Sequence, residues 1–343
     1  MALNTVLESL LEGRDLPEAE AATLLQELTN PGLAPAMAGA LLAALRAKGV
    51  SAAELRGFAG AMRAQARRPQ LPPGGASVDI VGTGGDKSGS FNLSTGAALL
   101  AAACGLRVVK HGNRSVSSRA GSADVLEALG LNLPLDEKRA GACLAATGFT
   151  FLFAPHYHPA MKNVAPIRQA MGVRTVFNIL GPLSNPAEPE FHVIGAFDAG
   201  TAELMAEALS GMNIRRAFVV HGAEGWDEPT PVGPFTLFDV RPGNVARSQR
   251  APANYGLKLC DSAALAGGDA AYNAQELKEV LCGRDRGAHR DALLLSAALA
   301  LEVSGHCATA REAIDVAARA IDSGASARLL DKLAKFAAEA AGA

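Results

Sequence analysis

The segment DIVGTGGDKSGSFNLST, residues 79–95, has the composition of a phosphate-binding loop. Gly82, Gly84 and Gly85 carry no side chain that would keep an anion from the backbone, and their freedom to adopt positive φ lets successive amides converge. The apolar helix that we predict from Ser94 onward adds free N–H groups and the positive end of a helix dipole. Short polar side chains gather at the same place: Ser90, Asn92, Ser94 and Thr95.

Two common nucleotide motifs are excluded by single residues. A P-loop needs glycine before its Lys-Ser pair, where this chain has Asp86, and the dinucleotide fingerprint needs a third glycine where it has Lys87. A glycine turn by itself is more often a structural loop than a site. The density of glycine and hydroxyl residues before an apolar helix nevertheless favours an anion site.

A second polar loop, KHGNRSVSSRAGSAD, covers residues 110–124. Lys110 and Arg114 offer fixed positive charge to a phosphate, and we expect Ser122 also to cap a helix that runs to Leu129. The structural alternative is a serine-rich surface loop with solvated charges. The hydroxyl groups that favour a phosphate site belong to Ser115, Ser117, Ser118 and Ser122.

Two adjacent carboxylates, Asp227 and Glu228, stand in the loop HGAEGWDEPTP. Such a pair is usually only solvated. Beside a polyanion site, however, it would repel the ligand unless a cation bridged the two, and Mg²⁺ takes one or two carboxylates together with substrate phosphates. These residues therefore form the predicted metal site.

A fourth segment contributes His156, His158 and Arg168. The two histidines are two residues apart and point to opposite faces of an extended chain, which disfavours a shared metal. Arg168 offers a planar fork to a carboxylate, although an exposed helix arginine is an equal alternative. No Ser-His-Asp order, zinc pattern or paired acid and base carboxylates stand out elsewhere.

The elements that must position these loops alternate between strand and helix. Two consecutive parallel strands with a helix between them, as predicted for residues 77–110, set the loops at their carboxyl ends side by side. The sequence therefore predicts an α/β protein with a largely parallel central sheet flanked by helices. The segments predicted as strands are 77–82, 106–110, 149–154, 192–197 and 216–222.

The first part of the chain reads as helical throughout. Apolar residues recur at helical spacing over 33–45, and Ser51 with Glu54 forms a capping-box signature before another amphipathic helix. The run RRPQLPPGG ends this pattern and suggests a linker. We expect a small helical domain over 1–70, with helices around 160–185 packed on it, and an α/β domain over 71–343.

Composition narrows the functional classes. With 343 residues, 49% hydrophobic and 19% charged, the chain has a sizeable core, and a net charge of −2 gives it no general attraction to nucleic acid or anionic lipid. Its five cysteines show no Cys-x-x-Cys spacing, which favours free thiols in the cytoplasm. The first residues lack a signal-peptide pattern, and the apolar run TGAALLAAACGL is too short to span a bilayer.

As a set, the motifs resemble the anthranilate phosphoribosyltransferase family of tryptophan biosynthesis. The resemblance rests on GTGGD, FNLST, KHGNRSVSS, GSAD, FLFAP, HPAMK, FNILGPLSNP and the Asp-Glu loop, in this order. It implies a fold like that of nucleoside phosphorylases, a homodimer formed through the helical domain, and a site for 5-phosphoribosyl-1-pyrophosphate (PRPP), whose pyrophosphate lies at the glycine turn.

The resemblance also implies roles for individual residues. The donor PRPP would contact Gly82, Gly85, Asp86, Ser90, Asn92, Leu93, Ser94, Thr95, Lys110, His111, Gly112, Asn113, Arg114, Ser115, Val116, Ser117, Ser118 and Ser122. Anthranilate would contact Gly82, Asn113, Arg168, His111 and His158. Two Mg²⁺ ions per subunit would be held by Ser94, Asp227 and Glu228.

A few positions depart from the family pattern. Lys87 replaces a frequently small residue, and Ser90 replaces a frequent threonine but keeps the hydroxyl group. Trp226, Pro229 and Pro231 give the metal loop an unusual setting. No motif residue is lost.

The implied reaction is displacement at the anomeric carbon of ribose, in which the anthranilate amine attacks as pyrophosphate leaves. No residue stands out as a general base, and an arylamine is already neutral at pH 7. Two alternatives are a pyrimidine nucleoside phosphorylase-like enzyme and a non-catalytic relative that binds nucleic acid. The KHGNR loop and the Asp-Glu pair argue against the first, and the net charge argues against the second.

Overall fold

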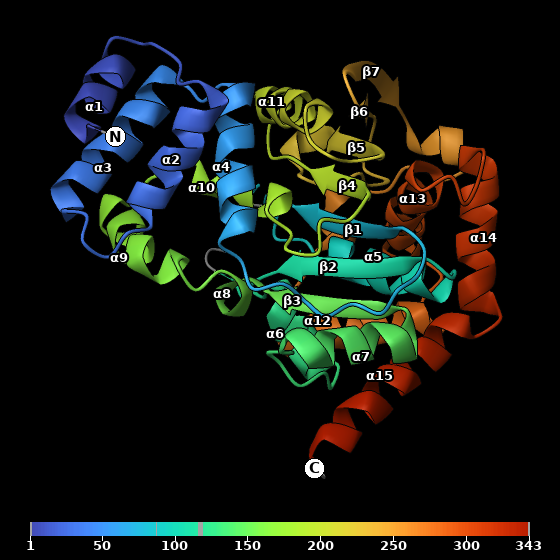
Figure 1. The fold of residues 1–343 in the computed structure, drawn as a ribbon. Coiled ribbons are helices and arrows are strands. Elements are labelled where there is room, and N and C mark those ends of the chain that lie inside the picture. Colours follow the sequence, from blue (N-terminus) through green and yellow to red (C-terminus); the bar gives the residue numbers. More distant parts are fainter. Residues whose placement is uncertain (1, 87, 116–118, 342–343) are drawn as a thin grey trace.

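The chain folds into a group of N-terminal helices beside a larger α/β body (Figure 1). The structure is a computed structural model and describes residues 2–86, 88–115 and 119–341. As predicted, the N-terminal part is helical. Its helices are α1 (Leu3–Leu11), α2 (Glu18–Leu28), α3 (Pro35–Lys48) and α4 (Ala52–Ala64).

Helix α4 begins with the predicted capping box. The Ser51 hydroxyl accepts from the Glu54 amide at 3.3 Å, and the Glu54 carboxylate accepts from the Ser51 amide at 2.8 Å. Glu54 is fully buried, where it also accepts from the Leu16 amide at 2.9 Å and pairs with Lys48 at 2.9 Å. One carboxylate thus joins the start of α4 to the connection before α2 and to the end of α3.

The segment that follows α4 connects the helices to the sheet. Residues 67–75 form neither helix nor strand, and the Gln70 amide donates to the Glu137 carbonyl at 2.8 Å. A Cβ atom on Gly141 would lie 1.9 Å from the Gln70 carbonyl oxygen. Helix α7 (Glu137–Thr147) therefore needs glycine at the point where this segment crosses it. The connection is therefore fixed against the α/β body.

In the described part of the chain, seven strands form one sheet in the order β3-β2-β1-β4-β5-β6-β7. Strands β3, β2, β1, β4 and β5 run parallel, whereas β6 and β7 extend the β5 edge in antiparallel orientation. The predicted parallel βαβ unit and largely parallel sheet are thus confirmed. The strands are β1 (Ser77–Gly82), β2 (Arg107–Gly112), β3 (Phe149–Phe153), β4 (Phe191–Gly195), β5 (Arg216–His221), β6 (Phe235–Arg241) and β7 (Asn244–Arg250).

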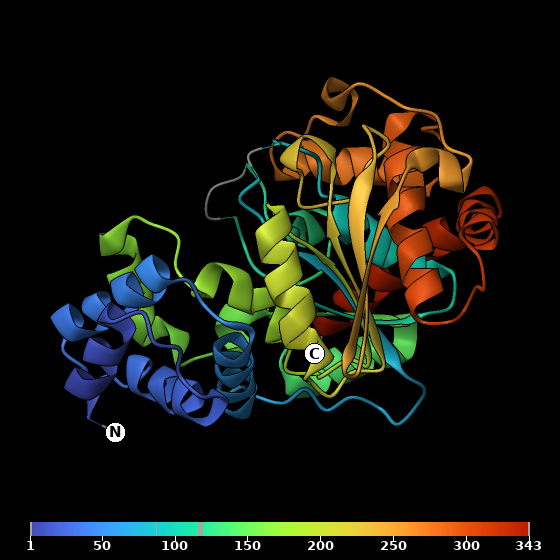
Figure 2. The same ribbon diagram turned by 90° about the horizontal axis from the view of Figure 1, so that it is seen from above.

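Helices cover both faces of the sheet, with the N-terminal helices to one side and α13 and α14 on the other (Figure 2). The α-helices that follow β1 are α5 (Leu93–Ala103), α6 (Ser122–Ala128), α7 (Glu137–Thr147), α8 (Ala154–Tyr157), α9 (Met161–Met171), α10 (Phe177–Leu180), α11 (Ala199–Ser210), α12 (Ala270–Leu281), α13 (Ala288–Val303), α14 (Ala310–Asp322) and α15 (Ala325–Ala341). Short 3₁₀ turns are η1 (Gly181–Leu183), η2 (Ala223–Gly225), η3 (Pro252–Tyr255) and η4 (Ser262–Leu265).

Two hydrophobic clusters make up the core of the described residues. One contains α5, α12, α13 and one face of the sheet, including Phe149, Phe218 and Leu299. The other joins α1–α4 to α11 and the opposite face, through residues such as Phe58 and Val219. The N-terminal helices therefore share a core with the sheet, and their position relative to it is set by apolar packing.

Helix α9 lies against the N-terminal helices. It packs on α3, and the Asn163 side chain donates to the Thr29 carbonyl at the end of α2 at 2.8 Å. Among the described residues, no helix is long and apolar enough to cross a membrane.

Local helix starts differ from the sequence prediction at two serines. Helix α5 begins at Leu93 with Asn92 before it, so Ser94 lies inside the first turn and is not the cap. Helix α6 begins at Ser122 itself, and Ser122 donates to the Asn113 carbonyl at 3.2 Å instead of capping the helix. The helix start predicted at Ser94 and the cap predicted at Ser122 were therefore wrong by one or two residues.

Candidate functional site

The predicted loops meet at the carboxyl edge of the parallel strands. The sheet order places β2 on one side of β1 and β4 on the other, so the chain leaves β1 and β4 in opposite directions. Ligands on open α/β sheets bind at this kind of topological switch point. The loops after β1, β2 and β5 all open at this edge.

The loop after β5 must cross β4 to reach β1, because β4 lies between them. Two glycines make this crossing fit. A Cβ atom on Gly195, at the end of β4, would lie 1.4 Å from the Asp227 carbonyl oxygen. A Cβ atom on Gly82, at the end of β1, would lie 2.4 Å from the Asp227 carboxylate. The absence of side chains at these strand ends lets Asp227 lie over the switch point.

Asp227 and Glu228 reach the amides that the sequence predicts as anion donors. The Gly84 amide donates to Asp227 Oδ2 at 2.5 Å, and Gly84 has a φ of +67° that turns this amide inward. The Ser94 amide, in the first turn of α5, donates to Glu228 Oε1 at 3.1 Å. These amides therefore bind anionic oxygen, which is the chemistry a phosphate group would present.

A third carboxylate joins this pair. Asp86 Oδ2 accepts from the Asp227 amide at 3.3 Å. Burial, and then the nearby Asp86, raises the pKa of Asp227 to about 7. Burial and the charge of Asp227 also raise the pKa of Glu228. The cluster therefore holds more negative charge than its surroundings stabilise.

Lys110 is the cation buried beneath the cluster. Its ammonium donates to the Ile80 carbonyl at 2.5 Å and to the Ser94 hydroxyl at 3.3 Å. Burial lowers its pKa, an effect opposed by Asp79, Glu228 and Asp227. One lysine faces several carboxylates, and this excess of negative over positive charge favours the binding of a further cation.

The cluster fits a magnesium ion on chemical grounds. Its donors are hard carboxylate oxygens, as Mg²⁺ requires. Glu228 Oε2 is buried without a hydrogen-bond partner among the described residues, so one strong acceptor is free to bind a cation. A small cavity beside it is lined by Ser94, Gly195, Asp227, Glu228 and Ser296.

The polar side chains before α5 are fixed by neighbouring elements. Asn92 donates to the Ala120 carbonyl at 3.2 Å and accepts from Asn273 of α12 at 2.8 Å. Ser90 accepts from the Ser88 hydroxyl at 3.3 Å. Leu93 and Thr95 are buried, and the Thr95 hydroxyl has no partner among the described residues.

The loop after β2 is organised by acidic residues of α6. Arg114 forms two hydrogen bonds of 2.6 Å with Glu127 and one of 3.0 Å with Asp124. Asp124 also accepts from the Ser115 amide at 3.0 Å, and the Arg114 guanidinium lies 5.6 Å from the Phe153 ring centre. Arg114 is therefore already paired at the surface. Gly112 and Asn113 lead into this loop, whereas Val116, Ser117 and Ser118 lie outside the described residues, as does Lys87.

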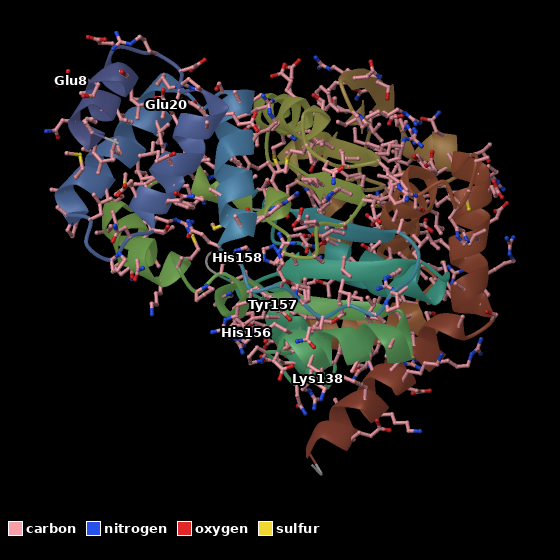
Figure 3. All side chains as sticks on the ribbon, viewed as in Figure 1. Glu8, Glu20, Lys138, His156, Tyr157 and His158 are labelled. Carbon is pink, nitrogen blue, oxygen red and sulfur yellow. The ribbon has the colours of Figure 1, made fainter. Side chains whose placement is uncertain are left out.

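The histidines separate into two environments. His156 lies 3.4 Å from the Glu137 carboxylate of α7, whereas the His158 ring packs edge-on against His111 with centroids 5.1 Å apart. Figure 3 shows His156 and His158 on opposite sides of Tyr157, and the segment is the short helix α8 and not the extended chain assumed from the sequence. Burial lowers the pKa of His111 to about 3 and that of His158 to about 4. Both rings are neutral at pH 7.

Arg168 is half-buried near the end of α9, with its guanidinium 5.2 Å from the Phe177 ring centre. Burial lowers its pKa, and no hydrogen bond or ion pair of its guanidinium is found among the described residues. A buried guanidinium without a carboxylate partner is suited to binding one from a ligand.

Comparisons with known proteins agree on one family. Residues 4–66 match the description "Glycosyl transferase family, helical bundle domain" and residues 74–327 match "Glycosyl transferase family, a/b domain". A curated relative, anthranilate phosphoribosyltransferase of Desulforudis audaxviator, is 47% identical over 97% of this chain and 96% of its own. The chain belongs to the anthranilate phosphoribosyltransferase family.

Solved structures of this family have the same fold. The anthranilate phosphoribosyltransferase of Thermus thermophilus matches with a TM-score of 0.90 and 41% identity, covering 96% of this chain and 98% of that one. The enzyme of Saccharomyces cerevisiae in complex with PRPP and Mg matches with a TM-score of 0.88 and 27% identity, covering 98% of each chain. These relatives are named neither as phosphorylases nor as nucleic-acid-binding proteins.

Within the anthranilate phosphoribosyltransferase fold, sequence reasoning missed residues that hold the site together. Asn185, in the motif FNILGPLSNP, donates at 2.8 Å both to the Asp79 carboxylate and to the Val109 carbonyl, which ties that motif to β1 and β2. Asp79 is fully buried, and burial raises its pKa to about 6. The sequence did offer a signal for Asp79, because it is a charged residue inside the otherwise apolar strand SVDIVG.

Arg174 was also missed. Its guanidinium donates to the Gly85 carbonyl and lies 4.0 Å from the Phe197 ring centre, while its own carbonyl accepts from Arg46 of α3 at 2.5 Å. Arg174 therefore links the glycine turn to the N-terminal helices. Its position in a short loop after α9 gave no sequence signal.

Proposed function

We propose that the protein transfers the phosphoribosyl group of PRPP to the amine of anthranilate, giving N-(5-phosphoribosyl)anthranilate and pyrophosphate in tryptophan biosynthesis. The observation that carries the proposal is that Asp227 and Glu228 accept from the amides of Gly84 and Ser94, while Asp86 accepts from the amide of Asp227 itself. Amides and cation-binding carboxylates at one point suit a magnesium-bound diphosphate. Membership in the family supports the same activity.

The glycine turn and the first turn of α5 would bind the pyrophosphate of the donor. A phosphate oxygen would compete with Asp227 and Glu228 for the amides of Gly84 and Ser94, and these two carboxylates would then be available to hold a cation. Lys110 would add a fixed positive charge below the leaving group. The other proposed donor contacts are Gly82, Gly85, Ser90, Asn92, Leu93, Thr95, His111, Gly112, Asn113, Arg114, Ser115 and Ser122, with Val116, Ser117 and Ser118.

We propose that Asp227, Glu228 and Ser94 hold magnesium, with two ions per subunit. Family structures from Saccharomyces cerevisiae contain Mg, which supports the choice of metal. When bound, the metal neutralises charge that develops on the departing pyrophosphate. Glu228 Oε2 is buried without a hydrogen-bond partner in the described part of the chain, which supports its role as a ligand.

The acceptor anthranilate would lie toward Arg168, Asn113, Gly82, His111 and His158, with its carboxylate on Arg168. A yeast family structure contains 4-fluoroanthranilate, which supports an aromatic acceptor of this kind. With pKa values of about 3 and 4, His111 and His158 are weak proton acceptors. Their neutral rings would form an uncharged wall for the aromatic ring.

The reaction requires little acid-base help from the protein. The arylamine is neutral at pH 7, and two bound substrates in the right orientation react as if at very high concentration. Amides that stabilise charge as pyrophosphate leaves lower the barrier, because they need no reorganisation during the reaction. No residue is assigned as a general base.

We also propose a cytoplasmic homodimer that assembles through the N-terminal helices. The dimer rests on the resemblance of the motifs to the family. The five cysteines are free, as in a reducing compartment. Sedimentation equilibrium tests the dimer directly.

The activity is tested by incubating the protein with PRPP, Mg²⁺ and anthranilate and following the loss of anthranilate fluorescence. The double variant Asp227→Asn with Glu228→Gln keeps the shape of both side chains and removes both charges. We expect a loss of turnover of at least about 100-fold and a changed Mg²⁺ dependence, with the circular dichroism spectrum retained. Turnover and Mg²⁺ dependence equal to those of the wild type would refute the metal role.

Two further arms of this experiment separate the possible failures. Absence of product with the wild-type protein under all metal conditions would refute the proposed reaction. Release of ribose 1-phosphate from a pyrimidine nucleoside and inorganic phosphate would favour a phosphorylase instead.

A further inference from the structure

A second group of side chains that could hold a metal ion lies at the connection between α12 and α13, behind the loop that precedes α5. Glu276 of α12, Asp285 of the connecting loop and His289 of α13 bring one ligand atom each to within 4.8 Å of the others. His289 Nδ1 lies 3.1 Å from Glu276 Oε2 and 3.4 Å from Asp285 Oδ2. None of these residues has a part in the proposed transfer reaction.

The two distances that involve His289 Nδ1 match the requirements of a small tetrahedral ion. Zinc binds nitrogen and oxygen at about 2.0–2.1 Å, so two ligand atoms on a tetrahedron around it lie about 3.3 Å apart. The two distances from Nδ1 fall on either side of this value. Three protein ligands with water at the fourth position are a common zinc arrangement.

The charges around the cluster also favour a cation. Nearby arginines are paired elsewhere, Arg284 with Glu279 and Arg290 with Asp322. In the described part of the chain, no ion pair joins Glu276 or Asp285 to lysine or arginine, so the His289 ring is the partner of both carboxylates. The carboxylates of Glu276 and Asp285 bring two negative charges to one point, and a divalent ion would neutralise them.

The side chains are held in position before any ion binds. Asp285 Oδ1 accepts from the Gly287 amide at 2.6 Å, which leaves Oδ2 directed at His289. The His289 ring packs on Phe91 with centroids 4.1 Å apart, and its Nε2 atom is buried without a partner among the described residues. Nδ1 is therefore the ring atom that faces ligands, and the cluster is preorganised.

We propose that Glu276, Asp285 and His289 form a binding site for a divalent transition-metal ion of the zinc class, separate from the magnesium site. Imidazole with carboxylates suits zinc better than magnesium, which prefers oxygen ligands alone. Phe91 immediately precedes Asn92 in the donor loop, so a bound ion would fix α12 and α13 behind that loop. The ion acts there as a structural clamp.

The test uses metal-stripped, full-length protein titrated with ZnCl₂ in a calorimeter, with excess Mg²⁺ present. His289→Gln and Glu276→Gln each remove one ligand, whereas His306→Gln removes an exposed imidazole and is the matched control. We expect each ligand variant to lose one zinc equivalent or to bind it at least about tenfold more weakly, with His306→Gln unchanged. Zinc should also raise the Tm of the wild type more than that of His289→Gln.

A second titration makes the result independent of the catalytic site. The variant Asp227→Asn with Glu228→Gln should keep the zinc equivalent that depends on His289. Equal zinc stoichiometry and affinity in the wild type and His289→Gln, or no zinc binding by the wild type, would overturn the proposal. Co²⁺ gives a further criterion, since a thiolate charge-transfer band retained in His289→Gln would assign the bound ion to a cysteine.

Discussion

Replacing Gly195 with alanine tests whether the crossing of β4 sets the metal site. The added Cβ atom would lie 1.4 Å from the Asp227 carbonyl oxygen and 2.6 Å from its carbonyl carbon. Ordinary contacts begin near 3.4 Å, so the carbonyl oxygen has to move by about 2 Å. Gly195 does not have a positive φ, and alanine is therefore excluded only by this contact.

The displaced atoms belong to the residue that we propose as a metal ligand. A misplacement of about 1 Å can reduce a rate about 100-fold, so we expect kcat/KM to fall at least about 100-fold, equivalent to roughly 2.7 kcal/mol of transition-state stabilisation. The assay is the loss of anthranilate fluorescence over a range of Mg²⁺ concentrations. The half-saturating Mg²⁺ concentration should rise.

Two other glycines provide a graded control. A Cβ atom on Gly60 of α4 meets nothing within 4 Å, so Gly60→Ala should leave activity unchanged and stabilise the helix by about 0.5–1 kcal/mol. The nearest atom to a Cβ on Gly82 is Asp227 Oδ2, which belongs to a movable side chain and not to the backbone. Gly82→Ala should therefore raise the half-saturating Mg²⁺ concentration less than Gly195→Ala does. Activity of Gly195→Ala within about threefold of the wild type, at unchanged Mg²⁺ dependence, would refute the reasoning.

Three further changes test other parts of the site. Arg168→Ala should raise the KM for anthranilate at least about tenfold with little change in the KM for PRPP, and an unchanged acceptor KM would remove Arg168 from the site. Arg174→Ala should raise the KM for PRPP, because the Gly85 carbonyl loses its donor, whereas Arg174→Lys should restore part of it; equal effects on both substrates would indicate a merely structural role. In metal-free protein, the pKa of Asp227 is higher in the folded state than in the unfolded state, so between about pH 4 and 7 the folded state binds more protons. The free energy of unfolding therefore falls as the pH rises through this window. Asp227→Asn should therefore stabilise the protein in EDTA by up to about 4 kcal/mol at pH 8, measured by urea unfolding, and a gain that is the same at pH 4 would contradict the assigned pKa.

The sequence predicted helices and strands well where the interactions that form them join residues close together in the chain. The capping box at Ser51 formed as predicted because its two hydrogen bonds join residues three apart in the chain. The antiparallel extension β6–β7 was not predicted, although Pro242 and Gly243 mark the turn between these strands. The β7 strand is largely exposed and polar, so the apolar pattern that identified the other strands was weak there.

The sequence indicated the chemical role of several site residues but not which residues they contact. The paired carboxylates Asp227 and Glu228 were predicted to bind a metal, because beside a phosphate an unneutralised pair would repel the ligand. Asp86 as a third member of the cluster was not expected in that role, since its contact with Asp227 spans 141 residues of the chain. Arg114 was expected to face a phosphate, and in this structure it is paired with Glu127.

By itself, the sequence determined the five parallel strands and the N-terminal helices, and that glycine-rich, hydroxyl-rich and acidic loops follow the strands. It did so because periodicity, turn residues and capping act over a few residues. Only the tertiary structure decided that β4 separates β1 from β5, so that the Asp227 loop must cross the end of β4 at Gly195. Strand order and the pairing of buried charges depend on contacts between residues far apart in the chain, and those contacts exist only after the sheet and its two cores have formed.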